Sequence, residues 1–499
     1  MVSSNYVVLL LYLLVFSSWV HVQSEEEEGY ISATVFNKGL DFLVKELLID
    51  KAKTSMLPIE FPNIEKHVKI PVIGNVYMEA SNMTLYSLDI TSSTAKIGDT
   101  GIVISATAAT ANLSLNWKYS YSSWLFPVPI GDKGEASVQV QGLDIGLTIG
   151  LKNEQGSLKL SVLESGCYVK DISIVLKGGA SWLYQGFVDA FEGLITSKLE
   201  NTIPEKIAKK IESFNSVLES FPKEVPITSL AALNITFVGD PELSDTSLKL
   251  ALNGSFSAKD DIPVSKYEYL QDPSSCNSPP RMVKISVNDH VFESLLMVYF
   301  EADKMHWIVD KVPDKSLLNT AGWKYIVPQL YKQYPDDDMN LNISVYSPPL
   351  IRFEKAQVAV TVPLDVIINV LDGGETIPVA CVSVVISAAA SPEISQNTLA
   401  GTVKLNKFSM SLQWSKIGNL HVNLVQSLIS TLLRTIVLPF VNLKLSRGVP
   451  LPNLYGYGLE NTKIEYANSW FAVCSDLVPI KKLQTLFVPG LHHAQTFEM

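Results

Sequence analysis

The sequence is short of the residues and motifs on which most enzyme chemistry depends. Histidine occurs seven times in 499 residues, and the charged residues together make up only 18%. The chain contains no HExxH, GxGxxG or P-loop pattern. Gly254-Ser255-Phe256 lacks the second glycine that a GxSxG nucleophile elbow requires. These absences predict a protein that is not an enzyme, and they disfavour a lipase of the α/β-hydrolase type in particular.

Metal-binding patterns are missing as well. The cysteines form no CxxC pair and have no histidine nearby, which disfavours zinc. Asp336–Asp338 lacks the alternating spacing of a calcium loop and indicates a solvated acidic turn, and His492-His493 is typical of a solvated tail. We expect no metal and no cofactor. Four cysteines allow three pairings, and free buried thiols are an equal alternative; the four are Cys167, Cys276, Cys381 and Cys474.

The chain also lacks a basic surplus and, after its start, long apolar runs. The formal net charge of −11 excludes a protein-wide basic field for nucleic acid. Residues 7–16 form an apolar run too short to span a bilayer, which predicts a signal peptide over 1–24; an uncleaved anchor is the alternative. We therefore expect a secreted, extracellular protein. N-glycosylation sequons fit this route, and they begin at Asn82, Asn112, Asn234, Asn253 and Asn342.

What the chain has in abundance is apolar side chains, 47% of all residues, in two periodic arrangements. Residues 40–48 and 183–214 carry apolar stripes at helical spacing, and Pro204 is expected to kink the second helix. Between them the period is two, with phase slips near Ala108–Ala109 and at Gly142. Such slips predict β-bulges and strongly bent strands in a curled antiparallel sheet.

The second half repeats this arrangement. Helical patterns occupy roughly 289–300, 315–334 and 419–446, and strand patterns cover 358–366 and 403–414. Residues 257–281 break all periodicity with proline, serine and charge, which predicts a linker. We therefore divide the chain into a signal peptide (1–24), an N-terminal domain (25–256), the linker (257–281) and a C-terminal domain (282–499).

Several short segments, in order over nearly the whole chain, form a specific set. They are 38–42 (KGLDF), 181–187 (SWLYQGF), 281–283 leading into 288–292, 347–350 (SPPL), 416–452 and 459–474. Together they resemble the bactericidal/permeability-increasing and lipopolysaccharide-binding protein family, in a plant-type form. The resemblance implies an α+β fold, a two-domain boomerang. Each domain is then a highly curved antiparallel β-barrel wrapped on a long amphipathic helix, and a central sheet joins the two.

The wide apolar faces of helix and sheet have two interpretations. In an arbitrary α+β protein they form a dry core. The resemblance instead implies that each barrel holds a phospholipid between its helix and its sheet. On this hypothesis the helical stripes of the N-terminal domain predict pocket residues, namely Leu43, Leu47, Phe187, Phe191 and Leu194.

Two departures from the family pattern bear on function. The family's disulfide from the strand near Cys167 to the long helix would need its partner at Pro204, so Cys167 is expected to be free or paired differently. The family's antibacterial members carry a Lys- and Arg-rich loop at the barrel tip, whereas residues 116–134 are rich in aromatics. Such rings suit insertion at a bilayer surface, or they cap the end of the barrel. The predicted tip residues are Trp117, Lys118, Tyr119, Tyr121 and Trp124.

Three functions follow as alternatives. The first is recognition of lipopolysaccharide or related bacterial lipids in innate defence, with acyl chains held in apolar pockets. The second is transfer of phospholipid between membranes, with transient contact to the membrane surface. The third is a secreted lipid hydrolase, against which the missing nucleophile motif argues. The expected partners are lipopolysaccharide and phospholipid as ligands, and no nucleic acid.

Overall fold

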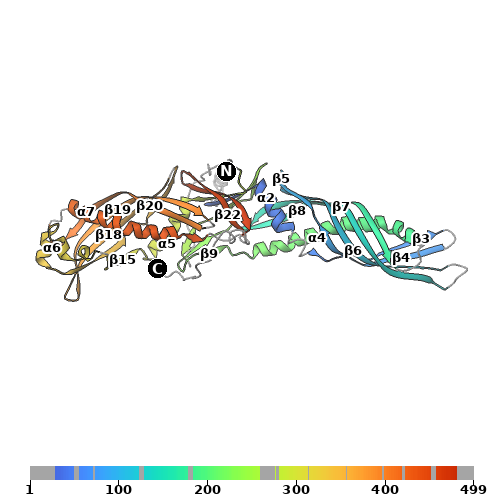
Figure 1. Ribbon diagram of the computed structural model, residues 1–499, viewed down its shortest axis with the longest axis horizontal. Coiled ribbons are helices and arrows are strands. Elements are labelled where there is room, and N and C mark those ends of the chain that lie inside the picture. Colours follow the sequence, from blue (N-terminus) through green and yellow to red (C-terminus); the bar gives the residue numbers. More distant parts are fainter. Residues whose placement is uncertain are drawn as a thin grey trace, which may run out of the picture.

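The molecule is elongated, with a curled sheet at each end and another sheet between them (Figure 1). This computed structural model describes residues 29–479 except 50–55, 71–73, 123–127, 178–183, 259–275, 277–279, 313, 356, 396–397, 419–421 and 451–456. The predicted signal peptide and most of the predicted linker lie outside the described residues. The domain boundaries therefore stay predictions.

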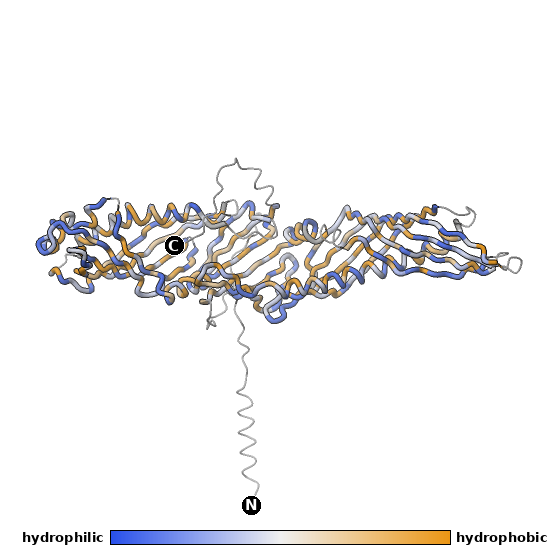
Figure 2. The backbone as a smooth tube through the Cα atoms, turned by 90° about the horizontal axis from the view of Figure 1, so that it is seen from below, coloured by the Kyte–Doolittle hydropathy of each residue, from blue (hydrophilic) through white to orange (hydrophobic). Residues whose placement is uncertain are grey.

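Long strands of alternating character build the N-terminal sheet. Its order is β2-β4-β6-β7-β8, with β3 beside β4 and β5 beside β6, and all of these pairs are antiparallel. Apolar and polar residues alternate along these strands in Figure 2, so that one face is buried. The strands are β2 (Ile59–Glu60), β3 (Ile64–Ile70), β4 (Gly74–Asp89), β5 (Ser92–Ile97), β6 (Ile102–Tyr121), β7 (Ile130–Glu154) and β8 (Ser157–Lys177).

The two phase slips predicted in this sheet are confirmed, and they face each other across β6 and β7. The register shifts on both sides of Ala109. Ala108 and Gly142 both have left-handed backbone, with φ of 54° and 65°. The freed Ala108 N–H donates to the Asp144 carboxylate at 2.8 Å. The side chains of β6 that point into the core therefore lie at even-numbered positions before the bulge and at odd-numbered positions after it. The strands can bend there without exposing their apolar face.

Helix α4 (Tyr184–Glu219) lies along the N-terminal sheet (Figure 1). It follows the predicted stripe and continues through Pro204 as one helix of 36 residues. Its fully buried face consists of Phe187, Phe191, Ile195, Leu199 and Ile203. The earlier predicted helix forms α2 (Asn37–Leu43) and a π-helical turn η1 (Val44–Ile49), which place Leu40 and Val44 in a second core.

The C-terminal half has the same plan, as predicted. Its sheet has the order β15-β16-β18-β19-β20-β21, with β17 beside β18. The strands are β15 (His306–Val309), β16 (Asp338–Val345), β17 (Leu350–Glu354), β18 (Gln357–Asp372), β19 (Glu375–Ser395), β20 (Thr398–Ser415) and β21 (Val449–Pro450). The helices are α5 (Asp289–Glu301), η3 (Lys315–Leu318), η4 (Thr320–Trp323), α6 (Pro328–Gln333), α7 (Val422–Leu432), η5 (Leu433–Val437) and α8 (Leu438–Arg447).

A central sheet joins the two halves, as the resemblance implied. Its order is β11-β12-β1-β14-β23-β22, so that β1 of the first half pairs with β14 of the second. The strands are β1 (Ile31–Phe36), β11 (Glu242–Leu243), β12 (Ser247–Leu252), β14 (Val283–Asn288), β22 (Tyr457–Ala467) and β23 (Trp470–Pro479). A small sheet of β9 (Glu224–Pro226), β10 (Ala231–Asn234) and β13 (Phe256–Ala258) completes the fold.

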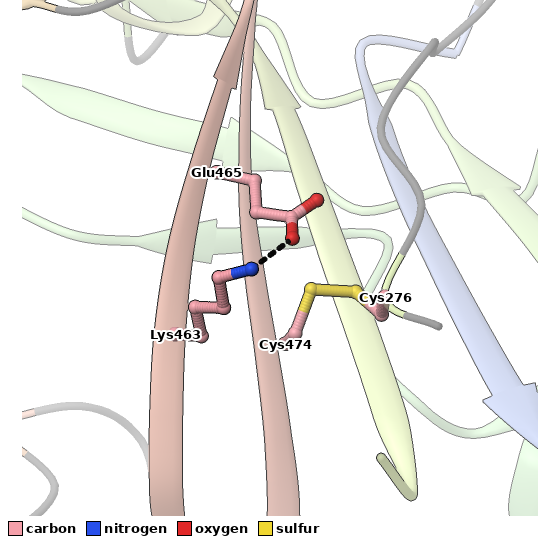
Figure 3. The surroundings of a disulfide bond; sticks show 4 residues. All are labelled: Cys276, Lys463, Glu465 and Cys474. Carbon is pink, nitrogen blue, oxygen red and sulfur yellow. Dashed lines mark hydrogen bonds and ion pairs between the residues drawn. A yellow bond between two sulfur atoms is a disulfide. The ribbon is translucent and has the colours of Figure 1, made fainter. Parts of the chain in front are cut away.

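A disulfide bond ties the segment between the halves to the central sheet. It joins Cys276 to Cys474 of β23, beside the ion pair of Lys463 and Glu465 on β22 (Figure 3). The sequence alone left three complete pairings and free buried thiols open, and the structure has one bond with two free thiols. Cys167 and Cys381 are free thiols.

A charge cluster beside the disulfide also connects the halves. The carboxylate of Asp476 in β23 accepts hydrogen bonds from Lys38 of α2 at 2.9 Å and from Arg281 at 3.0 Å. Burial on its own raises the pKa of Asp476, but the hydrogen bonds from Lys38 and Arg281 outweigh it and hold this pKa below its ordinary value. The cluster therefore stabilises the fold while Asp476 is ionised.

This cluster predicts loss of stability in acid. Because the pKa of Asp476 is depressed in the folded state, its contribution is present above the ordinary value of about 3.9 and is lost as the pH falls below it. We expect Asp476→Asn to lower the free energy of unfolding by about 1.5–3 kcal/mol at pH 7, and the difference from wild type to shrink toward zero near pH 3. Urea titrations at several pH values measure this. A constant difference across the range would contradict the assignment.

Candidate lipid-binding site

An apolar cavity of about 150 Å³ lies between helix α4 and the inner face of the N-terminal sheet. The helix contributes Ile203, Ile207 and Ile211, one turn apart. Lys210 is the one charged residue among the described lining residues. The opposite walls come from β4, β6 and β7 and from the segment before β4; they are formed by Ile49, Met56, Leu57, Ile59, Leu85, Leu88, Ile90, Ile104, Ala106, Ile145 and Leu147. Apart from Lys210, the described lining has no side-chain group with which to hold water.

The size of this cavity limits what it can hold in its present form. A dry apolar cavity of about 150 Å³ accommodates a benzene-sized group. In this form it can take part of an acyl chain. The position of α4 against the sheet sets the size of the cavity, because α4 forms one of its walls.

Polar side chains of α4 attach the helix to the open edge of the sheet. Strand β8 is an edge strand, so one side of its backbone has no strand partner. Asn215 accepts from the Leu160 N–H at 2.8 Å and donates to the Leu160 carbonyl at 2.8 Å. Farther along, Glu200 accepts from the Val169 N–H at 3.0 Å. These bonds pair the edge at Leu160 and Val169, and they attach the helix on both sides of its cavity-lining residues.

The C-terminal half uses the same amide contact. Asn442 of α8 accepts from the Val403 N–H at 2.7 Å and donates to the Val403 carbonyl at 3.1 Å. Val403 lies in β20 beyond the short pairing with β21. An asparagine therefore fastens the long helix to an open strand edge in each half, although no residue-level repeat is evident in the sequence.

Removing the amide contact should loosen α4 measurably. Asn215 is 8% exposed, so Asn215→Ala leaves two backbone groups of Leu160 without their partner and should cost about 1–3 kcal/mol. We expect faster amide hydrogen exchange in peptides that cover 157–162. Asn201→Ala is the matched control, because the exposed Asn201 amide bonds only within α4. Equal exchange in both variants would contradict a clamp at Asn215.

The predicted pocket residues lie beside the cavity rather than around it. Phe187 and Phe191 are 2% and 0% exposed and stack on each other at 4.3 Å, in a core that Trp117 also enters. Aromatic rings fill the space there, and neither ring lines this cavity, so a role of Phe187 and Phe191 in lipid binding stays a prediction. Leu194 lines a half-polar groove on the other side of α4. Leu43 packs near the central sheet, and the side chain of Leu47 lies outside the described residues.

The prediction that Trp117 and Tyr119 form an exposed tip is wrong. Strand β6 continues to Tyr121, so both side chains keep the inward phase of Leu113 and Leu115. Trp117 is 1% exposed and donates from its indole to the carbonyls of Glu135 and Lys177. These rings cap the end of the barrel, which was the alternative interpretation.

The remaining tip residues differ from one another. Lys118 is exposed, Tyr121 packs at the edge of the core, and Trp124 lies outside the described residues. Across the β6–β7 pair Lys118 faces Lys133, and on its other side it faces Glu79. Two facing ammonium groups repel each other unless an anion lies between them.

Comparison with known proteins decides the family. Sequence models of the N-terminal and C-terminal domains of the LBP / BPI / CETP family match residues 39–221 and 226–478. The chain belongs to the LBP / BPI / CETP family. A putative BPI/LBP family protein of Arabidopsis thaliana is 46% identical over 93% of this chain and 95% of that protein. Human lipopolysaccharide-binding protein is 25% identical over 86% of this chain and 90% of that protein.

The fold of the LBP / BPI / CETP family is also found in this chain. The crystal structure of lipopolysaccharide binding protein matches with a TM-score of 0.57 at 20% identity, over 91% of this chain and 100% of that chain. The two-domain boomerang of curled sheets that the sequence predicted is thereby confirmed.

Cys167 is a free thiol, which is one of the two states that the sequence predicted for it. Burial, with smaller effects of Glu200 and Asp144, raises the pKa of Cys167 to about 12. The thiol is therefore protonated and unreactive at neutral pH. The hydrogen bond from Val169 to Glu200 connects the same strand and helix without a covalent bond.

The C-terminal helix of this LBP / BPI / CETP chain exposes much of its apolar surface. Val437, Phe440 and Leu443 are 43%, 60% and 55% exposed, with Lys444 above the Phe440 ring. The helix Val425–Arg447 has the length and composition of a membrane-crossing segment. Its cations include Arg434 and Lys444.

The predicted glycosylation sites differ in accessibility. Asn82 is exposed, whereas Asn112 and Asn342 are half-buried on outward-facing strand positions. The amide oxygens of Asn234 and Asn253 accept hydrogen bonds from Thr236 and Ser255 of their own sequons. Glycosylation at all five stays a prediction. Over the described ranges, no cluster of three His, Cys, Asp or Glu residues has the arrangement of a metal site.

Proposed function

We propose that this protein is a secreted, non-catalytic lipid-binding protein that takes up the acyl chains of lipopolysaccharide and related bacterial lipids in defence. The observation that supports this proposal most directly is the apolar cavity under α4. Relatives named lipopolysaccharide-binding protein and bactericidal permeability-increasing protein support the ligand class. The disulfide of Cys276 and Cys474 supports a secretory route, because such bonds persist in oxidising compartments.

The energetics favour binding without a chemical step. Each buried acyl methylene contributes about 0.8 kcal/mol relative to water, so a dozen contribute about 10 kcal/mol. Escape through water is then slow. A membrane or micelle offers nearly the same environment, so exchange at a lipid surface is close to neutral in free energy. Uptake and release therefore need only contact and an opening of α4.

Discrimination between lipids rests on charge in this proposal. Lys118 and Lys133 face each other at the barrel tip, and because Glu79 lies across from Lys118 on the other side, the three side chains leave one net positive charge for a lipid phosphate. We expect at least tenfold tighter binding to lipopolysaccharide micelles than to phosphatidylcholine vesicles at low salt. The preference should shrink as salt rises, because exposed charges are screened.

A variant pair tests this source of the preference. Lys118→Gln with Lys133→Gln should reduce the preference for lipopolysaccharide while leaving phosphatidylcholine binding unchanged. The matched control is Lys404→Gln with Lys407→Gln, which removes two exposed lysines from β20 in the other half. Equal, salt-insensitive binding to both lipids would contradict the recognition proposal. Release of fatty acid would contradict the non-catalytic one.

Phospholipid transfer is a second candidate function. The exposed apolar side chains of α8, with Lys444 and Arg447 beside them, suit contact with a bilayer surface better than recognition of one headgroup. Transfer predicts that Phe440→Ser with Leu443→Ser slows lipid exchange between vesicles and leaves the affinity for a soluble short-chain lipid unchanged. Unchanged exchange would remove the support for this candidate.

A further inference from the structure

Another hollow lies on the outer face of the C-terminal sheet. It has a volume of about 560 Å³, within the range of small-ligand sites, and crosses β18, β19 and β20. The inward side chains of these strands, such as Val366, Val382 and Val384, fill the core. Asp365, Ser383 and Ser411 lie in one row across the three strands and point the other way.

A hydrogen-bond network forms the floor of this groove. Ser383, 9% exposed, donates to the Asp365 carboxylate and accepts from the Gln413 side-chain amide at 2.8 Å. The network fixes the orientation of Gln413 and leaves its carbonyl oxygen as an acceptor. Within the described part of the chain, the Ser409 and Ser411 hydroxyls of the lining have no hydrogen-bond partner.

A β-bulge adds an aromatic wall. Cys381 pairs with Trp414 and Val382 with Leu412, so Gln413 is an extra residue in β20. The bulge puts the consecutive side chains of Gln413 and Trp414 on one face. Trp414 is 38% exposed, with the Lys416 ammonium over one face of its ring at 5.6 Å from the centroid, and Tyr346, another lining residue, is 49% exposed.

These features match the chemistry of a sugar. A pyranose ring presents an apolar C–H face that stacks on an aromatic ring, and hydroxyls that pair with amide, hydroxyl and carboxylate groups. With Asp365 as the one carboxylate in the lining, the groove does not favour an anion or a metal ion. We propose that this groove binds a neutral saccharide carried by another molecule, at a site separate from the lipid cavity and independent of the proposed lipid function.

Binding of neutral oligosaccharides tests the proposal. The probes are hexaoses of α-linked glucose, β-linked glucose, mannose and N-acetylglucosamine, and the measurements are saturation-transfer NMR and calorimetry on the full secreted chain. We expect at least one to bind, Trp414→Ala to weaken it at least tenfold, and Trp414→Phe to retain most of the affinity. Gln413→Leu should also weaken binding. Trp307→Ala is the control, because Trp307 is an exposed tryptophan of β15 outside the groove.

Several results would overturn the assignment. One is that none of the four hexaoses binds, and another is that Trp307→Ala weakens binding as much as Trp414→Ala in folded protein. Asn342 of β16 lies on the same outer face. It pairs with Ile367 of β18, which in turn pairs with Cys381 of β19. Binding that appears only after Asn342→Gln would mean that the chain's own glycan fills the groove. Failure of any of these tests leaves lipid binding in the N-terminal cavity unaffected.

Discussion

Replacing Ala106 by phenylalanine should remove most acyl-chain binding by the N-terminal half without unfolding it. Ala106 lies on β6 and lines the cavity opposite α4. A phenyl ring is close in size to the group that such a cavity accommodates. Overpacking a core typically lowers the free energy of unfolding by about 1–3 kcal/mol. Because the phenyl ring enters existing space, we expect a loss of about 1 kcal/mol, at the low end of this range. The lipid, in contrast, loses the room for several methylenes.

The expected size of this effect follows from the displaced chain. Excluding three methylenes forfeits about 2.4 kcal/mol, which is about a 60-fold loss of affinity. Titration with a fluorescent fatty acid measures it, and far-ultraviolet circular dichroism with a melting curve checks the fold. Thr107→Phe is the matched control, because the adjacent side chain is exposed on the opposite face of the strand. Unchanged affinity in folded Ala106→Phe protein would show that lipid binds elsewhere.

Local periodicity in the sequence was enough to predict much of the fold. The slips at Ala108 and Gly142 were visible because alternation is a property of neighbouring residues, and a slip changes the phase of every residue that follows. The same holds for the stripe of α4. The edge contact of Asn215 with Leu160 was not predictable, because its partner is distant in sequence and an asparagine in a helix has no signature of its own.

At the predicted barrel tip, residues 116–134, the sequence prediction went beyond what the alternation of residues supports. Trp117 and Tyr119 continue the alternation of Leu113 and Leu115, which is the signal that could have placed them on a strand. The loop assignment came from the family resemblance and from their aromatic character. Aromatic side chains suit both a membrane surface and the end of a core, so composition cannot separate the two. Strand phase can.

The cavity lining was missed for a different reason. Phe187 and Ile207 belong to one helical stripe, and sequence periodicity assigns both to the buried face. Whether a position is packed or hollow depends on the side chain it meets from the sheet. Phe187 meets Trp117, whereas the three isoleucines meet smaller side chains such as Ala106. This complementarity is tertiary information.

Removing the disulfide should be the most damaging covalent change to the fold. Cys276 and Cys474 are 198 residues apart, so the bond closes a long loop and restricts the unfolded chain strongly. We expect Cys276→Ala with Cys474→Ala to lower the free energy of unfolding by about 2–5 kcal/mol. The matched control is Cys167→Ala with Cys381→Ala, which removes two sulfurs that form no bond.

Reductant separates the bond from the packing of its sulfurs. In urea titrations followed by tryptophan fluorescence, dithiothreitol should destabilise the wild type and the Cys167→Ala, Cys381→Ala control by the same amount. It should leave the Cys276→Ala, Cys474→Ala protein unchanged, since nothing remains to reduce. The loss should be greatest at the central sheet, because Arg281 and Asp476 lie close to the two cysteines in sequence and form their ion pair beside the bond. Sensitivity to reductant that persists without Cys276 and Cys474 would contradict this pairing.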